Sequence, residues 1–238
     1  MTDLLKRVVN AHGGESIWHC LESIDAAVKV GGAIWAAKGV AGLFENIEVS
    51  ADLRTQSVLM SSRLGGWRSS FKGDTVTFES SEEHGIRQLE GARGSFSGHN
   101  QSTPWDKLHA IYFCSYALWT YLTIPFVYLQ PGFETIELPP WQESGETWRR
   151  LEVSFPNRIV THSQKQVSYF GPDGLLRRHD YTVDIMGGAT GANYASTIAE
   201  KAGLMFPTKR EVYAYDSGGK KIDEPLLVSI EFEDILPR

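Results

Sequence analysis

The sequence contains little cysteine, although it is long enough for one large domain. Its 238 residues include only two cysteines, Cys20 and Cys114. Each lies among apolar residues with no second cysteine close by, which argues against a disulfide framework and against a zinc site built from cysteines. We therefore expect both thiols to be free and buried, as in a protein of a reducing compartment.

The sequence also gives little indication of a leader segment or of a basic surface. The first residues, MTDLLKRVVNAHGGESIW, contain neither the apolar stretch nor the small-residue cleavage site of a secretory signal, so the sequence predicts a cytoplasmic protein. The formal net charge is −6, and Lys and Arg never form a cluster longer than two. This composition argues against nucleic acid as a partner and against an anionic membrane surface.

Patterns typical of metal and cofactor sites are absent as well. His162, His179 and Asp180 could converge in space, but no HxH or HExxH spacing accompanies them. The stretch GGATGA at 187–192 lacks the GK[ST] of a phosphate loop and the strand-to-helix setting of a dinucleotide fingerprint. We expect no metal and no cofactor.

What the sequence does contain is a series of short strands, preceded by an amphipathic helix. Apolar and polar residues alternate over 23–30 and 47–52, which is the period-two pattern of a sheet with one face in water. Hairpins are predicted around 72–74 and at the PDG turn of 172–174. Because no linker or repeat divides the chain, residues 1–238 are predicted to form one domain, with antiparallel strands on either side of a central helix.

The central segment, WDKLHAIYFCSYALWTYLTIPFVYL at 105–129, has no charged residue after Lys107. Its length alone would permit a membrane span. Pro125 interrupts it, however, and no asymmetry of Lys and Arg flanks it, so we interpret it as a buried helix in a helical insertion at about 104–130. The Gly- and Ser-rich stretch before it, 82–104, is predicted to be a mobile loop or flap.

One face of this helix repeats side chains that are aromatic and carry a polar tip. At about 100° per residue they share one stripe, whereas the opposite face is mostly plain hydrophobic. Such a stripe suits the wall of a pocket for an apolar ligand that needs a few hydrogen bonds. It also suits an ordinary core whose OH and NH groups bond to the backbone. The stripe comprises Trp105, His109, Tyr112, Tyr116 and Trp119.

Two strands carry candidates for the polar end of such a pocket. In LLRRHDYTVDI, the residues Arg177, His179 and Tyr181 share one face, and positions 178, 180, 182 and 184 share the other, which should be wet. Arg149 similarly lies on an apolar strand face. Because an inward arginine is costly unless it meets an anion, Arg149 or Arg177 is a candidate partner for an acidic group of the ligand, unless both lie at strand ends and reach water. His179 and Tyr181 would supply hydrogen bonds or proton transfer.

Several stretches resemble proteins of the lipoprotein-carrier-like (LolA-like) class. They are the opening VNAHGG with Trp18 after it, the hairpin YFGPDGLLRRHDY, and the last strands, from LMFPTKREVY to LVSIEFEDI. The resemblance covers most of the chain and implies an α+β fold: a large antiparallel sheet curled into an open half-barrel around a buried central helix, plus an N-terminal helix. The class includes bacterial cytosolic proteins with a central segment of the YFCSYALWTYLTIPF type and, more distantly, the violacein-pathway rearrangement enzyme, which is cytosolic and cofactor-free.

These features predict a protein that binds a small hydrophobic or amphipathic ligand, lipid-like or an aromatic metabolite, in a cavity between the sheet and the central helix. The predicted wall combines the helix stripe with Arg149, Arg177, His179 and Tyr181. A cofactor-independent enzyme acting in the same cavity is an alternative, with His109, His179 and Tyr181 as catalytic candidates. A third hypothesis is a peripheral membrane protein that inserts residues 121–133.

Overall fold

The computed structural model describes residues 2–82 and 85–238, and these residues form one thirteen-stranded sheet. The strand order is β6-β5-β4-β3-β2-β1-β13-β12-β11-β10-β9-β8-β7, and each pair of neighbours is antiparallel. The first and last strands of the chain therefore pair in the middle of the sheet, whereas β6 and β7, consecutive in the chain, lie at its two edges.

The helices are α1 Asp3–Ala11, α2 Glu15–His19, α3 Ala33–Ala37 and α4 Lys107–Thr123, with short 3-10 turns η1 Gly94–Phe96, η2 Phe126–Leu129 and η3 Asp184–Met186. The strands are β1 Ser23–Gly31, β2 Ile47–Asp52, β3 Ser57–Ser62, β4 Trp67–Lys72, β5 Thr75–Ser80, β6 Ile86–Glu90, β7 Glu134–Glu143, β8 Glu146–Ser154, β9 Lys165–Phe170, β10 Leu176–Val183, β11 Ala189–Lys201, β12 Leu204–Tyr213 and β13 Val228–Pro237.

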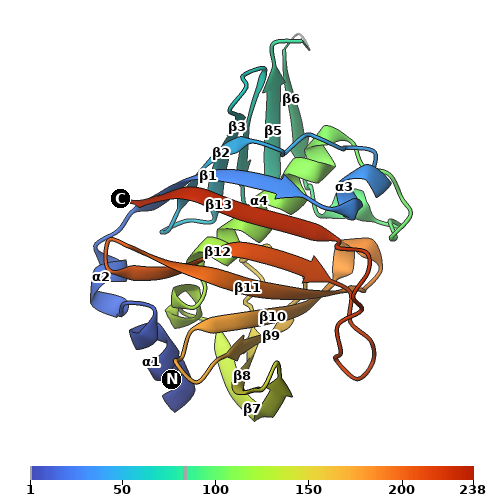
Figure 1. Cartoon of the computed structure of the whole chain (residues 1–238). Helices are drawn as coiled ribbons and strands as arrows, with labels where there is room; N and C mark the ends of the chain where they lie inside the picture. Colours follow the sequence, from blue (N-terminus) through green and yellow to red (C-terminus); the bar gives the residue numbers. More distant parts are fainter. Residues whose placement is uncertain (1, 83–84) are drawn as a thin grey trace.

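Helix α4 connects the two edges of the sheet. Because β6 and β7 lie at opposite edges, the chain between them must cross the interior of the curled sheet, and α4 runs diagonally behind β1 and β13 (Figure 1). Asp106 caps its first turn by accepting a hydrogen bond from the His109 N–H at 2.9 Å. The helix ends at Thr123, just before Pro125, as a proline in that place requires.

This arrangement confirms the predicted fold class, an open antiparallel half-barrel around a buried central helix with an N-terminal helix. The hydroxyl of Thr2 caps α1 by accepting a hydrogen bond from the Leu5 N–H at 3.2 Å. The apolar stripe of α1 is buried, as its spacing predicts. Across residues 2–82 and 85–238, we find no helix with the length and apolar character that crossing a membrane requires.

Three local expectations are corrected. The stretch 82–104 is not only a loop, because it contains the edge strand β6 and the turn η1; residues 83–84 lie outside the described part of the chain. The central helix begins at Lys107 rather than near 104, because Asp106 provides the cap. Both cysteines are free, but only Cys114 is buried, whereas Cys20 is exposed at the end of α2.

The central helix packs unequally on the two halves of the sheet. Its backbone lies closest to β3, β4, β5 and β6, where buried apolar side chains such as Phe71 and Phe78 fill the contact. Toward β9–β12, long polar and aromatic side chains fill the space between helix and sheet, and Tyr121, Tyr181 and Arg210 are among them. The polar side of the interior therefore faces the second half of the sheet.

Candidate functional site

A chain of hydrogen bonds joins α4 to β10 in the middle of the interior. His162, in the segment before β9, contacts the hydroxyl of Tyr116 with Nδ1 at 3.2 Å and that of Tyr121 with Nε2 at 3.1 Å. The Tyr121 hydroxyl lies 2.7 Å from that of Tyr181, whose ring stacks on the imidazole of His162 at 3.9 Å. All four side chains are buried. We call this group the tyrosine–histidine cluster.

A second buried chain lies beside it and leads toward η2. The Tyr128 hydroxyl lies 2.8 Å from the hydroxyl of Ser168, which lies 2.9 Å from Nδ1 of His179. The other ring nitrogen of His179 is 2.6 Å from Oε1 of Gln166, whose amide nitrogen donates to the Ser163 carbonyl at 2.8 Å. Both ring nitrogens of His179 are thus used within the protein.

Burial dominates the electrostatics of this interior. It lowers the pKa of His179 to about 3, with a further contribution from the charge of Arg210. It also lowers the pKa of His162 well below the ordinary value and raises the pKa of Tyr116, Tyr121 and Tyr181. At neutral pH these groups are uncharged and can donate and accept hydrogen bonds.

Two adjoining hollows open on either side of η2, at the end of the half-barrel near α1 and α2. Their volumes are about 680 and 630 Å³, and they share Glu15, Leu129, Gln130 and Pro131. Leu5 and Phe133 line the first, and Trp18 and Phe126 line the second. Tyr128, which begins the second buried chain, also lines the first hollow. We call these two hollows the mouth, because they adjoin each other and Tyr128 leads from the first of them to the interior.

The predicted helix stripe packs against protein side chains, and Trp105, His109 and Tyr112 surround the Phe96 ring of η1 with ring centroids 5.7, 4.7 and 5.6 Å away. Trp119 faces the first half of the sheet and donates its indole N–H to the Asp52 carbonyl at 2.7 Å. Tyr112 packs on Phe71 of β4, and Trp105 lies over Phe113. Only Tyr116 joins the tyrosine–histidine cluster. Tyr121, from the helix face that the sequence assigned to plain packing, takes the central position instead.

His109 lies at the other end of α4 and borders a different group of side chains. Its Nε2 is 3.1 Å from the Ser95 hydroxyl and its Nδ1 is 2.9 Å from the Asp106 carboxylate. This order of residues resembles a nucleophile–base–acid chain. The Ser95 hydroxyl, however, donates to the Ala92 carbonyl at 2.7 Å, and Asp106 already caps α4, so we assign the group a structural role.

The arginines predicted to face inward lie at the surface. Arg149 donates to both carboxylate oxygens of Glu137, at 2.8 and 2.9 Å, and Arg177 pairs with Glu146 and Asp173. The reason in β10 is an irregularity in its pairing with β9 between Leu176 and Arg178, which shifts the alternation by one residue. The structure places His179 and Tyr181 inward, as their alternation predicts.

The arginine of the interior is Arg210, on β12, which the sequence analysis did not single out. It is completely buried, donates to the Tyr121 carbonyl at 2.9 Å, and lies over the ring of Tyr121 at 4.8 Å. The sequence did contain a sign of this. Arg210 lies an even number of positions from Phe206 and Val212 on the same strand, so all three side chains point to the same, buried face of the sheet. None of the described His, Cys, Asp and Glu side chains form a group that could hold a metal ion.

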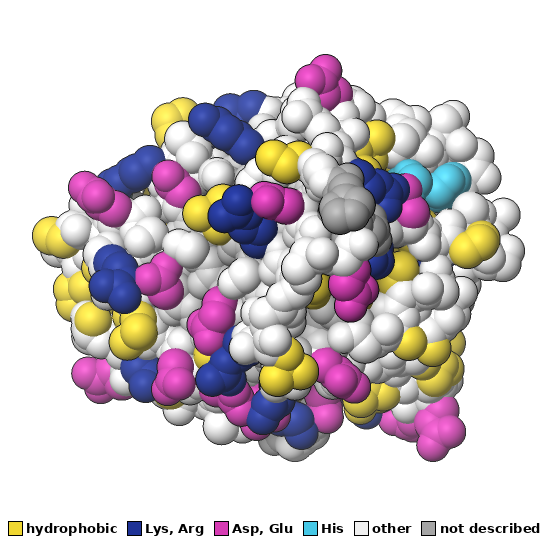
Figure 2. Space-filling model, turned by 90° about the horizontal axis from the view of Figure 1, so that it is seen from above, with side chains coloured by type: hydrophobic (Ala, Val, Ile, Leu, Met, Phe, Trp, Pro, Cys, Tyr) yellow, Lys and Arg dark blue, Asp and Glu magenta, His cyan; other side chains and the backbone are white. Residues whose placement is uncertain are grey.

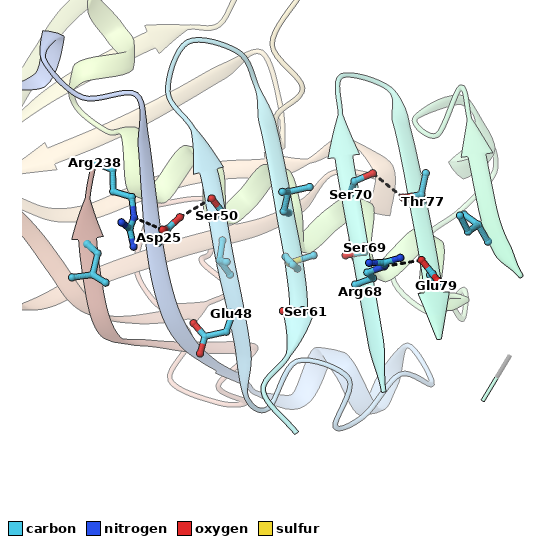
Figure 3. Close-up of a pocket in the computed structure, with 15 residues that line it drawn as sticks. Asp25, Glu48, Ser50, Ser61, Arg68, Ser69, Ser70, Thr77, Glu79 and Arg238 are labelled. Atoms are coloured by element: carbon cyan, nitrogen blue, oxygen red, sulfur yellow. Dashed lines mark hydrogen bonds and ion pairs between the residues drawn. The ribbon is translucent and has the colours of Figure 1, made fainter. Parts of the chain in front are cut away.

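Another hollow lies elsewhere, on the outer face of β13 and β1–β6. This groove of about 760 Å³ is lined by hydroxyl, charged and apolar side chains (Figure 3). Most of its polar groups are already paired: Arg238 with Asp25 at 2.5 Å, Arg68 with Glu79 at 2.7 Å, and Ser70 with Thr77 at 2.7 Å. On the face that Figure 2 shows, acidic and basic side chains are interspersed, without a patch of one sign.

Solved structures share the arrangement of sheet and central helix. A LolA superfamily protein from Nitrosomonas europaea aligns over 92% of this chain and 86% of its own, with a TM-score of 0.51 and 10% identity. A DUF1329 family protein from Desulfovibrio piger aligns over 99% and 90%, with a TM-score of 0.56 and 12% identity. The chain has the LolA-like fold. No protein-family model and no curated protein matches the sequence, and at these identities the likeness to the LolA-like structures concerns the fold alone.

Proposed function

We propose that this chain binds a small apolar or amphipathic ligand, lipid-like or aromatic, between α4 and strands β9–β12, and that the ligand enters through the mouth. The observation that carries the proposal is the gathering of buried polar side chains on this side of α4. Burying polar groups costs stability unless every one is paired, and a helix needs only apolar side chains to pack on a sheet. In small-molecule sites, a few placed polar groups of this kind orient the ligand within an apolar lining, and a ligand entering here would displace some of the side chains that fill the space.

The mouth supports the same proposal. Each of its two hollows falls within the volume range of small-molecule sites. Leu5, Trp18, Phe126 and Phe133 form the apolar part of their lining, which suits an acyl chain or an aromatic ring, and Glu15 and Gln130 are among the polar residues beside it. Tyr116, His179 and Tyr181, from the sequence prediction, would then contact the inner part of the ligand together with Tyr121 and His162.

Binding is favoured over catalysis by the state of His179. A general acid or base needs a pKa near the working pH and a free nitrogen within reach of the substrate. His179 has a pKa of about 3 and uses both ring nitrogens within the protein. His162 is likewise held between two tyrosine hydroxyls.

A pair of matched variants distinguishes the mouth from the outer groove. Leu129 is half-buried and borders both hollows of the mouth, whereas Leu59 lines the outer groove and is 57% exposed. A carboxylate in place of the apolar Leu129 side chain opposes contact with an apolar chain, because the carboxylate would have to lose its water. We expect Leu129→Glu to weaken binding of the uncharged amphiphile dodecanol by about tenfold or more, and Leu59→Glu to leave it unchanged.

Binding is measured by native mass spectrometry and by titration calorimetry on folded protein, below the concentration at which the amphiphile aggregates. If Leu59→Glu weakens dodecanol binding and Leu129→Glu does not, the ligand site is the outer groove. If the wild-type chain binds neither dodecanol nor an amphiphile of the same chain length with a charged head group, the proposed function is wrong.

A further inference from the structure

Three cationic side chains are completely buried among the described residues, and they differ in how their charge is satisfied. They are Lys38, Arg178 and Arg210. The Lys38 ammonium donates to three backbone carbonyls, those of Asn100, Gln101 and Thr103, each at 2.9 Å. All three of its N–H groups are therefore used, and nothing is left for a ligand.

Carboxylates neutralise the charge of the Arg178 guanidinium. It donates to both oxygens of Asp180, at 2.6 and 2.8 Å, and to Glu143 at 3.0 Å. The Gly219 carbonyl accepts a further hydrogen bond at 2.7 Å. This site lies on the opposite face of β10 from His179, and its charge is neutralised within the protein.

The charge of Arg210 is compensated less completely than that of Lys38 or Arg178. No described carboxylate forms an ion pair with it, and its Nε makes no hydrogen bond within the described chain. Its two other nitrogens reach the Tyr121 carbonyl at 2.9 Å and Oδ1 of Asn193 at 3.5 Å. Tyr121 lies in the last turn of α4, so the helix dipole offsets about half an elementary charge at most. Burial lowers the pKa of Arg210 to about 10, which leaves it charged at neutral pH.

A second incompletely paired donor lies beside it. Asn193 on β11 is completely buried, and its Nδ2 makes no hydrogen bond of good geometry among the described residues, although the amide interacts with the Tyr121 hydroxyl. A charge and an amide that are both incompletely paired, buried next to each other, are costly, because each loses its water without a full replacement. Two N–H donors and a positive charge match the two oxygens and single negative charge of a carboxylate.

We propose that the ligand carries a carboxylate head group, which Arg210 and Asn193 bind at the inner end of the site, while its apolar part lies toward the mouth. This inference rests on the proposed function. Arg210 lies over the ring of Tyr121 at 4.8 Å and donates to its carbonyl, and the Tyr121 hydroxyl lies 2.7 Å from that of Tyr181, so Arg210 adjoins the tyrosine–histidine cluster. Arg210 therefore lies where an amphipathic molecule entering head first would place its acid.

Dodecanoate and dodecanol test the head group, because they share one chain and differ in charge. We expect wild-type protein to bind dodecanoate at least about tenfold more tightly, the ratio that corresponds to about 1.4 kcal/mol. Arg210→Met should abolish this preference and still bind dodecanol. Asn193→Ala, a second variant that keeps the charge, should reduce the preference several-fold. Arg149→Met is the matched control, since that guanidinium pairs with Glu137 at the surface.

The outcomes separate the two proposals. Equal binding of both amphiphiles by the wild-type protein would overturn the carboxylate assignment and leave the proposed function standing. A preference that persists in a folded Arg210→Met variant, or one that Arg149→Met abolishes, would overturn the role of Arg210. If neither amphiphile binds, both proposals fail. The wild-type comparison does not depend on whether any variant folds.

Discussion

His12, His162 and His179 are buried among apolar and aromatic side chains, and burial lowers the pKa of each. The pKa falls to about 4 for His12 and about 3 for His179, and well below the ordinary value for His162. In the unfolded chain, the same side chains titrate near 6.5. The folded protein therefore holds three histidines neutral in a pH range where the unfolded chain protonates them.

This difference predicts a loss of stability in mild acid. Below pH 6.5 the unfolded state binds more protons than the folded state, so the free energy of unfolding falls as the pH drops toward the folded pKa values. Each buried histidine contributes about 1.4 kcal/mol per pH unit within that range. We expect His179→Gln to flatten the pH dependence of unfolding in urea by about that slope. His19→Gln changes an exposed histidine and should retain the wild-type slope; equal slopes in all three proteins would contradict the prediction.

Some residues of the candidate site could be predicted from the sequence, and others could not. Alternation along the strand correctly placed His179 and Tyr181 inward, and the same rule applied to β12 would have found Arg210. Tyr121 could not be found this way, because α4 is apolar on all sides and its periodicity does not tell which face meets which half of the sheet.

At the scale of elements, the irregularity in β10 decides which of two adjacent arginines is buried. Strict alternation puts Arg177 inward and leaves Arg178 in water. The register shift between Leu176 and Arg178 instead turns Leu176 into the core and leaves Arg177 half-exposed. Arg178 stays on the outer face but is covered by aromatic rings and by the 216–219 turn. A one-residue irregularity of this kind has no clear signal in a sequence, since any residue can occupy it.

We therefore expect substitution by methionine to destabilise the protein to very different extents at these two arginines. Arg178→Met leaves the buried carboxylate of Asp180 without its partner, so we expect it to lower the free energy of unfolding by about 3–5 kcal/mol. Arg177→Met removes ion pairs at the surface and should cost less than about 1 kcal/mol. Urea denaturation at neutral pH measures both, and similar losses for the two variants would show that Arg178 is not held as a buried ion pair.

At the scale of the whole molecule, the fold class was predictable and the strand order was not. Local alternation and turns identify antiparallel strands on either side of a central helix, and the resemblance to the LolA-like class implied that the sheet curls around it. The pairing of β1 with β13 joins the two ends of the chain, and no local pattern specifies such a contact. The N-terminal segment is held in the same long-range way: the His12 carbonyl accepts a hydrogen bond from the Met205 N–H at 3.0 Å.

Substitutions at two adjacent glycines can test whether the contact between the N-terminal segment and the β11–β12 turn holds α1 at the end of the half-barrel beside the mouth. Gly13 and Gly14 both have positive φ, so alanine at either costs about 1–3 kcal/mol in backbone strain. A Cβ on Gly13 would lie 2.2 Å from the Gly203 carbonyl oxygen, in the β11–β12 turn, whereas one on Gly14 meets nothing within 4 Å. We expect Gly13→Ala to cost about 1–3 kcal/mol more than Gly14→Ala, measured by urea denaturation. Because the clash would push α1 away from the sheet, hydrogen exchange should also rise in α1 for Gly13→Ala alone; equal stability and exchange in the two variants would mean that this contact does not hold the N-terminal helix in place.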